Sequence, residues 1–342
     1  MADIKYYKRG FGGDTFYMID TNILINIAKF YFNGRCGNDE VLTKQITEFI
    51  LKCRKNGILN YDYAILESSY DYGTNEINTD VMNKFMMVID TLFMYCKDKE
   101  VINNIKQIKP FCKERSQGEI KSIFECKLPR MLFNDPIVSI NNFYLIYLYF
   151  LKIYYLENIN MEPMEKVKCL YSYMINDINC FLAHEFILGQ MIFVGTYKDK
   201  SIAEGIMKFK KISKGKSAIK VIINALIDIM SYRRMTVNVD IGIKENMPIN
   251  WIFVTQDIEL QNYIELNTNF TTVISNDKIS DSFSHEFIPE EKYYAEWNEF
   301  YTNILNPNAK KRFIEYLTDS KDNVNNNKII EEIKFYENIV FI

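Results

Sequence analysis

The stretch "DTFYMIDTN", residues 14–22, is an apolar run that ends in an acid. Residues 15–19 are apolar and aromatic, which predicts a buried strand. From Ile23 onward apolar residues recur every three or four positions, which predicts a helix capped by Thr21 or Asn22. A strand that leads directly into a helix is the building unit of an α/β fold, so this stretch sets the expected fold class.

A second stretch, "NWIFVTQD" at 250–257, repeats the pattern. Residues 251–254 predict a strand, Asp257 follows it, and a helical pattern begins at the next residue. Ligands of α/β sheets bind beyond the carboxyl ends of strands, so an acid there is a candidate site residue. A single acid in this position is more often a helix cap, but two in one chain favour a site.

Composition narrows the class of protein. The chain has 342 residues, 48% of them hydrophobic, with a net charge of −3, so it can bury a large core but carries no overall basic field. Seven cysteines are scattered without a C-x-x-C pair, and the two histidines lie far apart. This pattern argues against a disulfide framework or a zinc site and is typical of a reducing cytoplasm.

A membrane location is not expected. The most apolar stretch, "FYLIYLYFL" at 143–151, is much shorter than the roughly 20 residues of a spanning helix, and it predicts a buried helix. The N-terminus lacks the apolar core of a secretory signal. We therefore expect a cytoplasmic protein without a membrane partner.

Between the two strand–helix junctions, the sequence predicts mainly helices. Long helical patterns interrupted by prolines fill the middle, "SAIKVIINALIDIMSYRRM" predicts another helix, and "FTTVIS" predicts one more strand. The sequence thus predicts a split α/β core, a large helical insertion and a helical C-terminal extension. The expected boundaries are 1–78 with 212–290, 79–211, and 291–342.

The residues at the two strand ends resemble a known family. Asp20-Thr21-Asn22 after an apolar strand resembles the opening motif of PIN-domain nucleases, and "FVTQD" resembles the later strand end of that family. The resemblance covers roughly 14–75 and 215–275. It implies a three-layer core around a mostly parallel sheet, with an insertion that is unusually large for the family.

The same resemblance implies two further acids. The family places a Glu on an early helix, which Glu67 in "AILESSY" matches, and an Asp on a later helix, which Asp228 in "NALIDIM" matches. Alternatives remain at both positions. Asn224 lies one helical turn before Asp228, Asp240 lies in an expected loop, and Asp71 shares an expected helix face with Glu67.

The resemblance also implies a chemistry. Carboxylates that converge repel each other and favour a divalent cation, and oxygen ligands select Mg²⁺ or Mn²⁺. A metal-dependent endoribonuclease that hydrolyses RNA phosphodiester bonds is therefore expected. The expected catalytic and metal-binding residues are Asp20, Glu67, Asp228 and Asp257, oriented by Thr21, Asn22, Asn224 and Thr255.

An RNA substrate needs cations near the acids. The stretch "KFKKISKGKSAIK" directly precedes the helix that carries Asp228, so it is a candidate contact for RNA. A solvated lysine-rich loop is the other interpretation. The candidate contacts are Lys208, Lys210, Lys211, Lys214 and Lys216.

Two other functions share features with this sequence. Haloacid-dehalogenase-like phosphatases also end their first strand at an Asp, but they need a second Asp where this chain has Asn22. A non-catalytic PIN-like adaptor that binds RNA or protein would retain the fold without a complete set of acids. Relatives that act as toxins are held by a partner protein, so an inhibitory or regulatory partner is a further expectation.

Overall fold

The computed structural model describes residues 3–10, 12–71, 76–103, 105–113, 142–209, 216–244, 249–266, 270–275, 278–283, 287–307 and 326–340. The chain is an α/β protein that forms two compact units. The first unit comprises Met1–Asn134 and Ile227–Gln261, and the second comprises Asp135–Leu226 and Asn262–Ile342. Each unit is therefore assembled from two separate stretches of chain.

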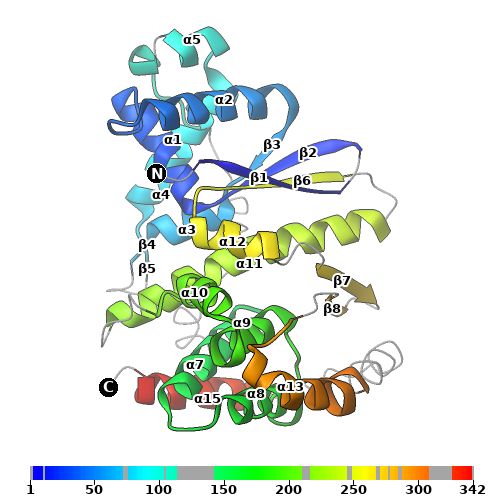
Figure 1. Cartoon of the computed structure of the whole chain (residues 1–342). Helices are drawn as coiled ribbons and strands as arrows, with labels where there is room; N and C mark the ends of the chain where they lie inside the picture. The colour runs from blue at the N-terminus through cyan, green and yellow to red at the C-terminus, as the bar shows by residue number, and fades with distance from the viewer. Residues whose placement is uncertain are drawn as a thin grey trace. The chain divides into compact units, whose positions relative to one another are not determined.

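The first unit contains the two strand–helix junctions (Figure 1). Two helices belong to the first unit only in part, because the boundaries between the two units fall within α11 (Lys216–Lys244) and α12 (Ile258–Leu266). The other elements are β1 (Lys5–Gly10), β2 (Asp14–Ile19), α1 (Thr21–Asn33), α2 (Glu40–Asn56), β3 (Ile58–Asn60), α3 (Asp62–Ser69), β4 (Tyr70–Asp71), β5 (Glu76–Ile77), α4 (Thr79–Asp90), the π-helical turn η1 (Thr91–Tyr95), α5 (Asp98–Asn103), the 3₁₀ turn η2 (Ile105–Gln107) and β6 (Ile249–Thr255).

The described strands form a four-stranded sheet in the order β1-β6-β2-β3. β2 pairs in parallel with both β3 and β6, whereas β1 pairs antiparallel with β6. The strands expected at 15–19 and 251–254 are confirmed, and β6 is longer than expected. The sheet is mixed because β1, which the sequence pattern does not predict, adds an antiparallel edge.

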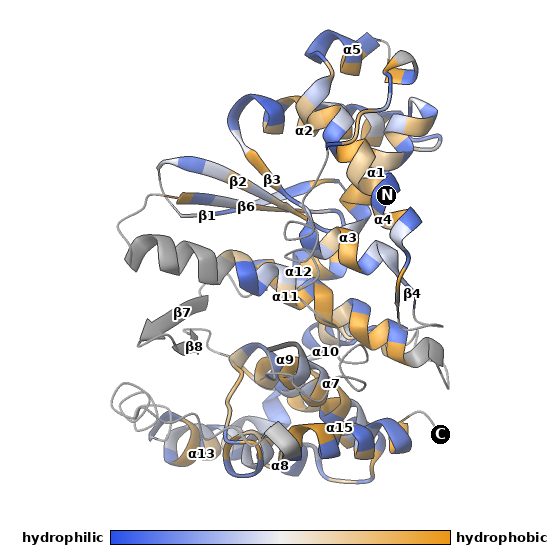
Figure 2. Cartoon of the chain, turned by 180° about the vertical axis from the view of Figure 1, so that it is seen from behind, coloured by the Kyte–Doolittle hydropathy of each residue, from blue (hydrophilic) through white to orange (hydrophobic). Residues whose placement is uncertain are grey.

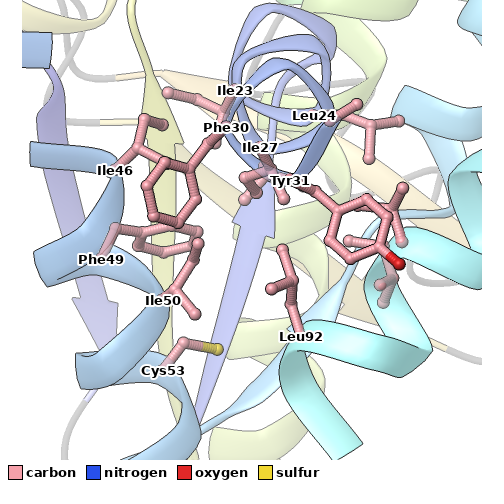
Figure 3. Close-up of a cluster of buried hydrophobic side chains, with 14 of the residues drawn as sticks. Ile23, Leu24, Ile27, Phe30, Tyr31, Ile46, Phe49, Ile50, Cys53 and Leu92 are labelled. Carbon is pink, nitrogen blue, oxygen red and sulfur yellow. The ribbon is translucent and has the colours of Figure 1, made fainter. Parts of the chain in front are cut away.

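One face of the sheet packs on α1 and α2. Tyr17 of β2 meets Phe49 of α2 edge-to-face, with ring centroids 5.8 Å apart. Ile23 and Ile27 of α1 and Ile46 of α2 are fully buried in the same cluster (Figure 3). α2 carries hydrophobic and hydrophilic residues along its length, as expected for a helix that covers a sheet with one face (Figure 2).

The opposite face of the sheet contacts α11. Successive strand residues point to opposite faces, so Ile252 joins the cluster with α1 and α2 while Phe253 points away from it. The ring of Phe253 meets Tyr232 of α11, with centroids 6.2 Å apart. Helices thus contact both faces of the sheet, which explains why β6 is buried along nearly its whole length.

The second unit is mostly helical. β7 (Phe270–Ser275) confirms the strand expected there, but it pairs with β8 (Lys278–Phe283) rather than with the main sheet. The other described elements are α7 (Asn142–Asn158), α8 (Pro163–Ser172), the π-helical turn η4 (Tyr173–Asp177), α9 (Ala183–Val194), α10 (Tyr197–Ile206), η6 (Glu291–Tyr293), α13 (Tyr294–Phe300), the π-helical turn η7 (Tyr301–Leu305) and α15 (Asn326–Val340).

Two helices organise the second unit. Every residue of α9 is buried, so this helix has no solvent face. α7 packs against the C-terminal helix α15, where the hydroxyl of Tyr147 donates to Glu337 Oε1 at 2.7 Å. The buried Lys152 Nζ donates to the hydroxyl of Tyr336, also at 2.7 Å. The buried helix expected at 143–151 is confirmed.

The domain boundaries drawn from the sequence remain a prediction. Residues 79–96, expected at the start of the helical insertion, form α4 and η1 and pack into the core with α1 and α2. Part of the expected helical tail, 308–325, lies outside the described residues. Among the helices that the structure describes, none is both long enough and apolar enough to cross a bilayer.

Candidate functional site

The two strand ends that carry acids lie side by side. β2 and β6 are neighbours and run in parallel, with Ile19 opposite Val254. The next residue, Asp20, donates its backbone N–H to the carbonyl of Val254 at 3.1 Å. Asp20 and Thr255 therefore leave the same edge of the sheet, as expected from the motif at each strand end.

Asp20 is held by three donors in a buried position. Its Oδ1 accepts the backbone N–H of Ile23 at 2.8 Å, which makes Asp20 the N-cap of α1. The expectation that Thr21 or Asn22 caps this helix is wrong, because the extended backbone at Asp20 places its carboxylate over the first turn. Its Oδ2 accepts the hydroxyl of Thr255 at 2.5 Å and the backbone N–H of Gln256 at 3.3 Å.

Burial raises the pKa of the Asp20 carboxyl from 3.8 to about 7. The hydrogen bonds from Thr255, Ile23 and Gln256 oppose this rise, because they stabilise the ionised form. The negative charge of Asp228 adds to it. Asp228 of α11 therefore lies close enough to Asp20 for its charge to raise the pKa of that carboxyl.

Asp257 is joined to Asp20 through Thr255. The backbone N–H of Asp257 donates to the Thr255 hydroxyl at 3.0 Å, and that hydroxyl donates to Asp20. Asp257 Oδ1 accepts the N–H of Leu260 at 3.0 Å, in the first turn of α12. Both strand-end acids thus also serve as helix caps, the alternative role that the sequence left open.

Glu67 reaches the same edge from α3. Its Oε2 accepts a short hydrogen bond from the hydroxyl of Thr21, the residue that follows Asp20. Asp71, the alternative to Glu67, does not share its helix face, because α3 ends at Ser69 and Asp71 lies in strand β4. Glu67 therefore lies beside the start of α1, where Asp20 caps the helix.

A contact joins α3, which carries Glu67, to α11, which carries Asp228. The guanidinium of Arg234 lies over the ring of Tyr63, 5.2 Å from its centroid. Tyr63 precedes Glu67 by about one helical turn on α3, and Arg234 follows Asp228 by less than two turns on α11. Asp62 belongs to the same contact, since burial raises its pKa and Arg234 opposes that rise.

The other candidates lie elsewhere. The loop expected around Asp240 is wrong, because α11 continues as helix to Lys244. Asn224 lies one turn before Asp228 on α11, within the stretch assigned to the second unit. Asn22 is exposed at the first turn of α1.

The lysine-rich stretch is described only at its ends. Lys208 and Lys216 belong to the second unit, and Lys216 begins α11. Lys210, Lys211 and Lys214 lie outside the described residues. Their contact with RNA stays a prediction.

Two polar residues at the site were not found from the sequence. The Asn26 side-chain amide, buried on α1, donates to Gln256 Oε1 at 2.8 Å. Gln256 in turn donates its backbone N–H to Asp20. Asn26 is a polar residue within the apolar stripe of α1, and Gln256 lies between Thr255 and Asp257, so both positions carried a signal.

The acids do not form a closed metal cage. Within the part of the chain that the structure describes, no three Asp, Glu, His or Cys side chains come together in a way that could hold a metal ion. Glu67 is bonded to Thr21, and Asp257 caps α12. Comparisons with protein families, with curated proteins and with solved structures find no match to this chain.

Proposed function

We propose that the protein is a metal-dependent endoribonuclease with a PIN-like three-layer core, acting at the edge of the sheet where β2 and β6 end. The observation that carries the proposal is the hydrogen bond from Thr255 to Asp20, which joins the two strand-end motifs 235 positions apart in the sequence. A helix cap alone would not require the second motif. The helices on both faces of the sheet support the three-layer core.

The donor set fits a hard divalent cation. Asp20 and Asp228 act on each other electrostatically, and Glu67 lies beside Asp20 through Thr21. Burial raises the pKa of Asp20, and a cation beside the carboxylate would oppose that rise by stabilising the ionised form. Asp20, Glu67 and Asp228 are the residues that would hold Mg²⁺ or Mn²⁺, with Asp257 at the rim. When bound, such an ion would activate water and stabilise the charge that develops on the phosphate.

The protein's own residues would orient the reacting groups. Thr255 fixes one oxygen of Asp20 and Ile23 fixes the other, so the carboxylate cannot rotate. Thr21 limits the positions of Glu67 in the same way. This arrangement suits hydrolysis of a phosphodiester, because it keeps acidic oxygens oriented before the substrate arrives.

A non-catalytic adaptor is the second candidate. One observation favours it: as they stand, the described acids do not close around a single ion. An adaptor would bind RNA or a protein partner through the same fold and would gain nothing from a divalent cation.

One experiment separates the two candidates. Labelled single-stranded RNA is incubated with the protein and Mn²⁺ or Mg²⁺, and the wild type is compared with Asp20→Asn. Asp14→Asn is the matched control, because Asp14 is an exposed acid at the opposite end of β2. We expect cleavage by the wild type and the control but not by Asp20→Asn. RNA retained without cleavage by the wild type would support the adaptor, and equal cleavage by Asp20→Asn would overturn the site.

A further inference from the structure

An exposed pair of stacked aromatic rings lies on the first unit, apart from the acids. Tyr95, at the end of η1, stacks on Phe111 with ring centroids 5.0 Å apart and planes 11° apart. The side chains are 57% and 36% exposed, which is unusual for two large rings in contact. We call Tyr95 and Phe111 the aromatic platform.

The platform is held in place by backbone hydrogen bonds. The hydroxyl of Thr91 accepts the N–H of Phe111 at 2.9 Å, and its own proton lies between the carbonyls of Met87 at 2.7 Å and Phe111 at 3.1 Å. The buried Asp90 accepts the N–H of Lys113 at 2.9 Å. Both Thr91 and Asp90 are fully buried, so the segment that carries Phe111 is fixed to the core.

The other side of the platform is fixed by Arg54 of α2. Its guanidinium donates short hydrogen bonds to the carbonyls of Leu92 and Cys96, on either side of Tyr95. It also pairs with Asp98 at 2.8 Å. The two rings are therefore presented by rigid backbone, which reduces the entropy lost when a flat ligand stacks on them.

Positive charge surrounds the platform in the sequence. Residues 97–113 contain five exposed lysines, of which Lys97, Lys99, Lys106 and Lys109 make no ion pair within the described residues. The same segment holds two acids: Asp98, which pairs with Arg54, and Glu100, which accepts the backbone N–H of Lys97 at 2.6 Å. Exposed lysines that lie close in the sequence to an exposed pair of rings favour a polyanion with flat groups.

We propose that the aromatic platform binds single-stranded nucleic acid, one base stacking on its exposed ring face while the lysines contact the phosphates on either side. Stacking on an aromatic side chain requires an unpaired base, because a duplex hides the faces of its bases. The lysines supply binding that weakens as salt rises. The choice of RNA as the ligand rests on the proposed function. The inference adds the place on the protein at which the RNA strand would bind.

The test measures binding without cleavage. A labelled single-stranded oligoribonucleotide is titrated with the full chain in EDTA, and affinity is compared for Tyr95→Leu and Tyr95→Phe. Leucine keeps the apolar contact but removes the flat face, whereas phenylalanine keeps the face. We expect about a tenfold loss of affinity for the leucine variant and none for the phenylalanine variant.

Matched controls come from the second unit. Tyr197 is 91% exposed, so Tyr197→Leu removes an even more accessible ring and should leave affinity unchanged. Lys109→Gln should reduce the dependence of affinity on salt, whereas Lys198→Gln should not. Thermal unfolding checks that each variant is folded.

Three results would overturn the platform: wild-type affinity for Tyr95→Leu, loss of affinity for Tyr95→Phe, or duplex RNA binding as tightly as single strands. Failure of the platform and of the nuclease can be told apart. Cleavage with Mn²⁺ but no effect of Tyr95→Leu would leave the nuclease standing without the platform. Binding that depends on Tyr95 without any cleavage would leave the platform standing without the nuclease.

Discussion

The hydroxyl of Thr255 lies 2.5 Å from Oδ2 of Asp20 and donates to it, although the two residues leave different strands. The same hydroxyl accepts the backbone N–H of Asp257 at 3.0 Å. A single side chain thus couples both acidic strand ends. Because it stabilises the ionised form of Asp20, Thr255 controls how readily that carboxyl gives up its proton.

Replacing Thr255 by Val should therefore raise the pKa of Asp20 above about 7, because the hydrogen bond that lowers it is lost. We expect a rise of about one pH unit. Carbon NMR of labelled aspartate carboxyls measures it directly, and the pH midpoint of metal-dependent cleavage should move in the same direction. Thr255→Ser keeps the hydroxyl and is the control; an unchanged pKa in the valine variant would contradict the assignment.

Asp20 should make the protein less stable as pH rises. Its pKa is 3.8 unfolded and about 7 folded, so the unfolded state releases the proton first. Below about pH 4 both states are protonated, and between about pH 4 and pH 7 the free energy of unfolding should fall by on the order of 2–4 kcal/mol. Urea unfolding at several pH values without divalent metal measures this slope.

Asp20→Asn should flatten that slope, since the amide does not ionise. Asp14→Asn should keep it, because Asp14 is exposed. The comparison uses the change with pH rather than absolute stability, because the amide also alters the hydrogen bonds with Thr255 and Gln256. Identical slopes in the wild type and Asp20→Asn would refute the raised pKa of the buried Asp20 carboxyl.

Mn²⁺ should raise the Tm of the wild type. A ligand that binds only the folded state, at a concentration one hundred times its Kd, adds about 2.7 kcal/mol of stability. We expect Glu67→Gln and Asp228→Asn to lose most of this stabilisation. Asp71→Asn should retain it, because Asp71 lies in β4 beyond the end of α3. Calorimetry with and without Mn²⁺ measures the change in Tm. An equal rise of Tm in Glu67→Gln and Asp228→Asn would exclude both residues as metal ligands.

The contact of Arg234 with Tyr63 should matter for metal binding as well as for stability. Arg234→Gln should cost about 0.5–1 kcal/mol from the lost cation–π contact. It should also weaken Mn²⁺ binding several-fold, because α11 would no longer hold Asp228 against the helix of Glu67. Tyr63→Phe keeps the ring and should behave like the wild type. A loss of stability without any change in Mn²⁺ affinity would show that the contact is only structural.

The hydrophobic pattern of the sequence predicted those strands and helices whose own residues favour them, but not those that depend on contacts with distant residues. β2 and β6 are apolar runs bounded by polar residues, and the structure confirms both. β1 was missed because half of its residues, in "KYYKRG", are charged, and it becomes a strand by pairing with the edge of β6. The end of α11 was missed because "TVNVDIGIK" is rich in β-branched residues, whose low helix propensity the longer helix overrides.

The candidate site was also predicted in part. That both acids leave one edge of the sheet followed from their positions after parallel strands. The pairing of Asn26 with Gln256 could not be predicted, because the residues are 230 positions apart and neither is acidic. The cap at Asp20 was assigned one residue too late, because Asp, Thr and Asn all make good caps and only the backbone angles decide among them.

The position of β6 has a consequence for biosynthesis. β6 lies between β1 and β2, which are not neighbours, so the first 248 residues leave a gap in the middle of the sheet. A ribosome must release the chain beyond residue 257 before Thr255 can reach Asp20. Nascent or prematurely terminated chains that end before β6 therefore lack the assembled edge of the sheet.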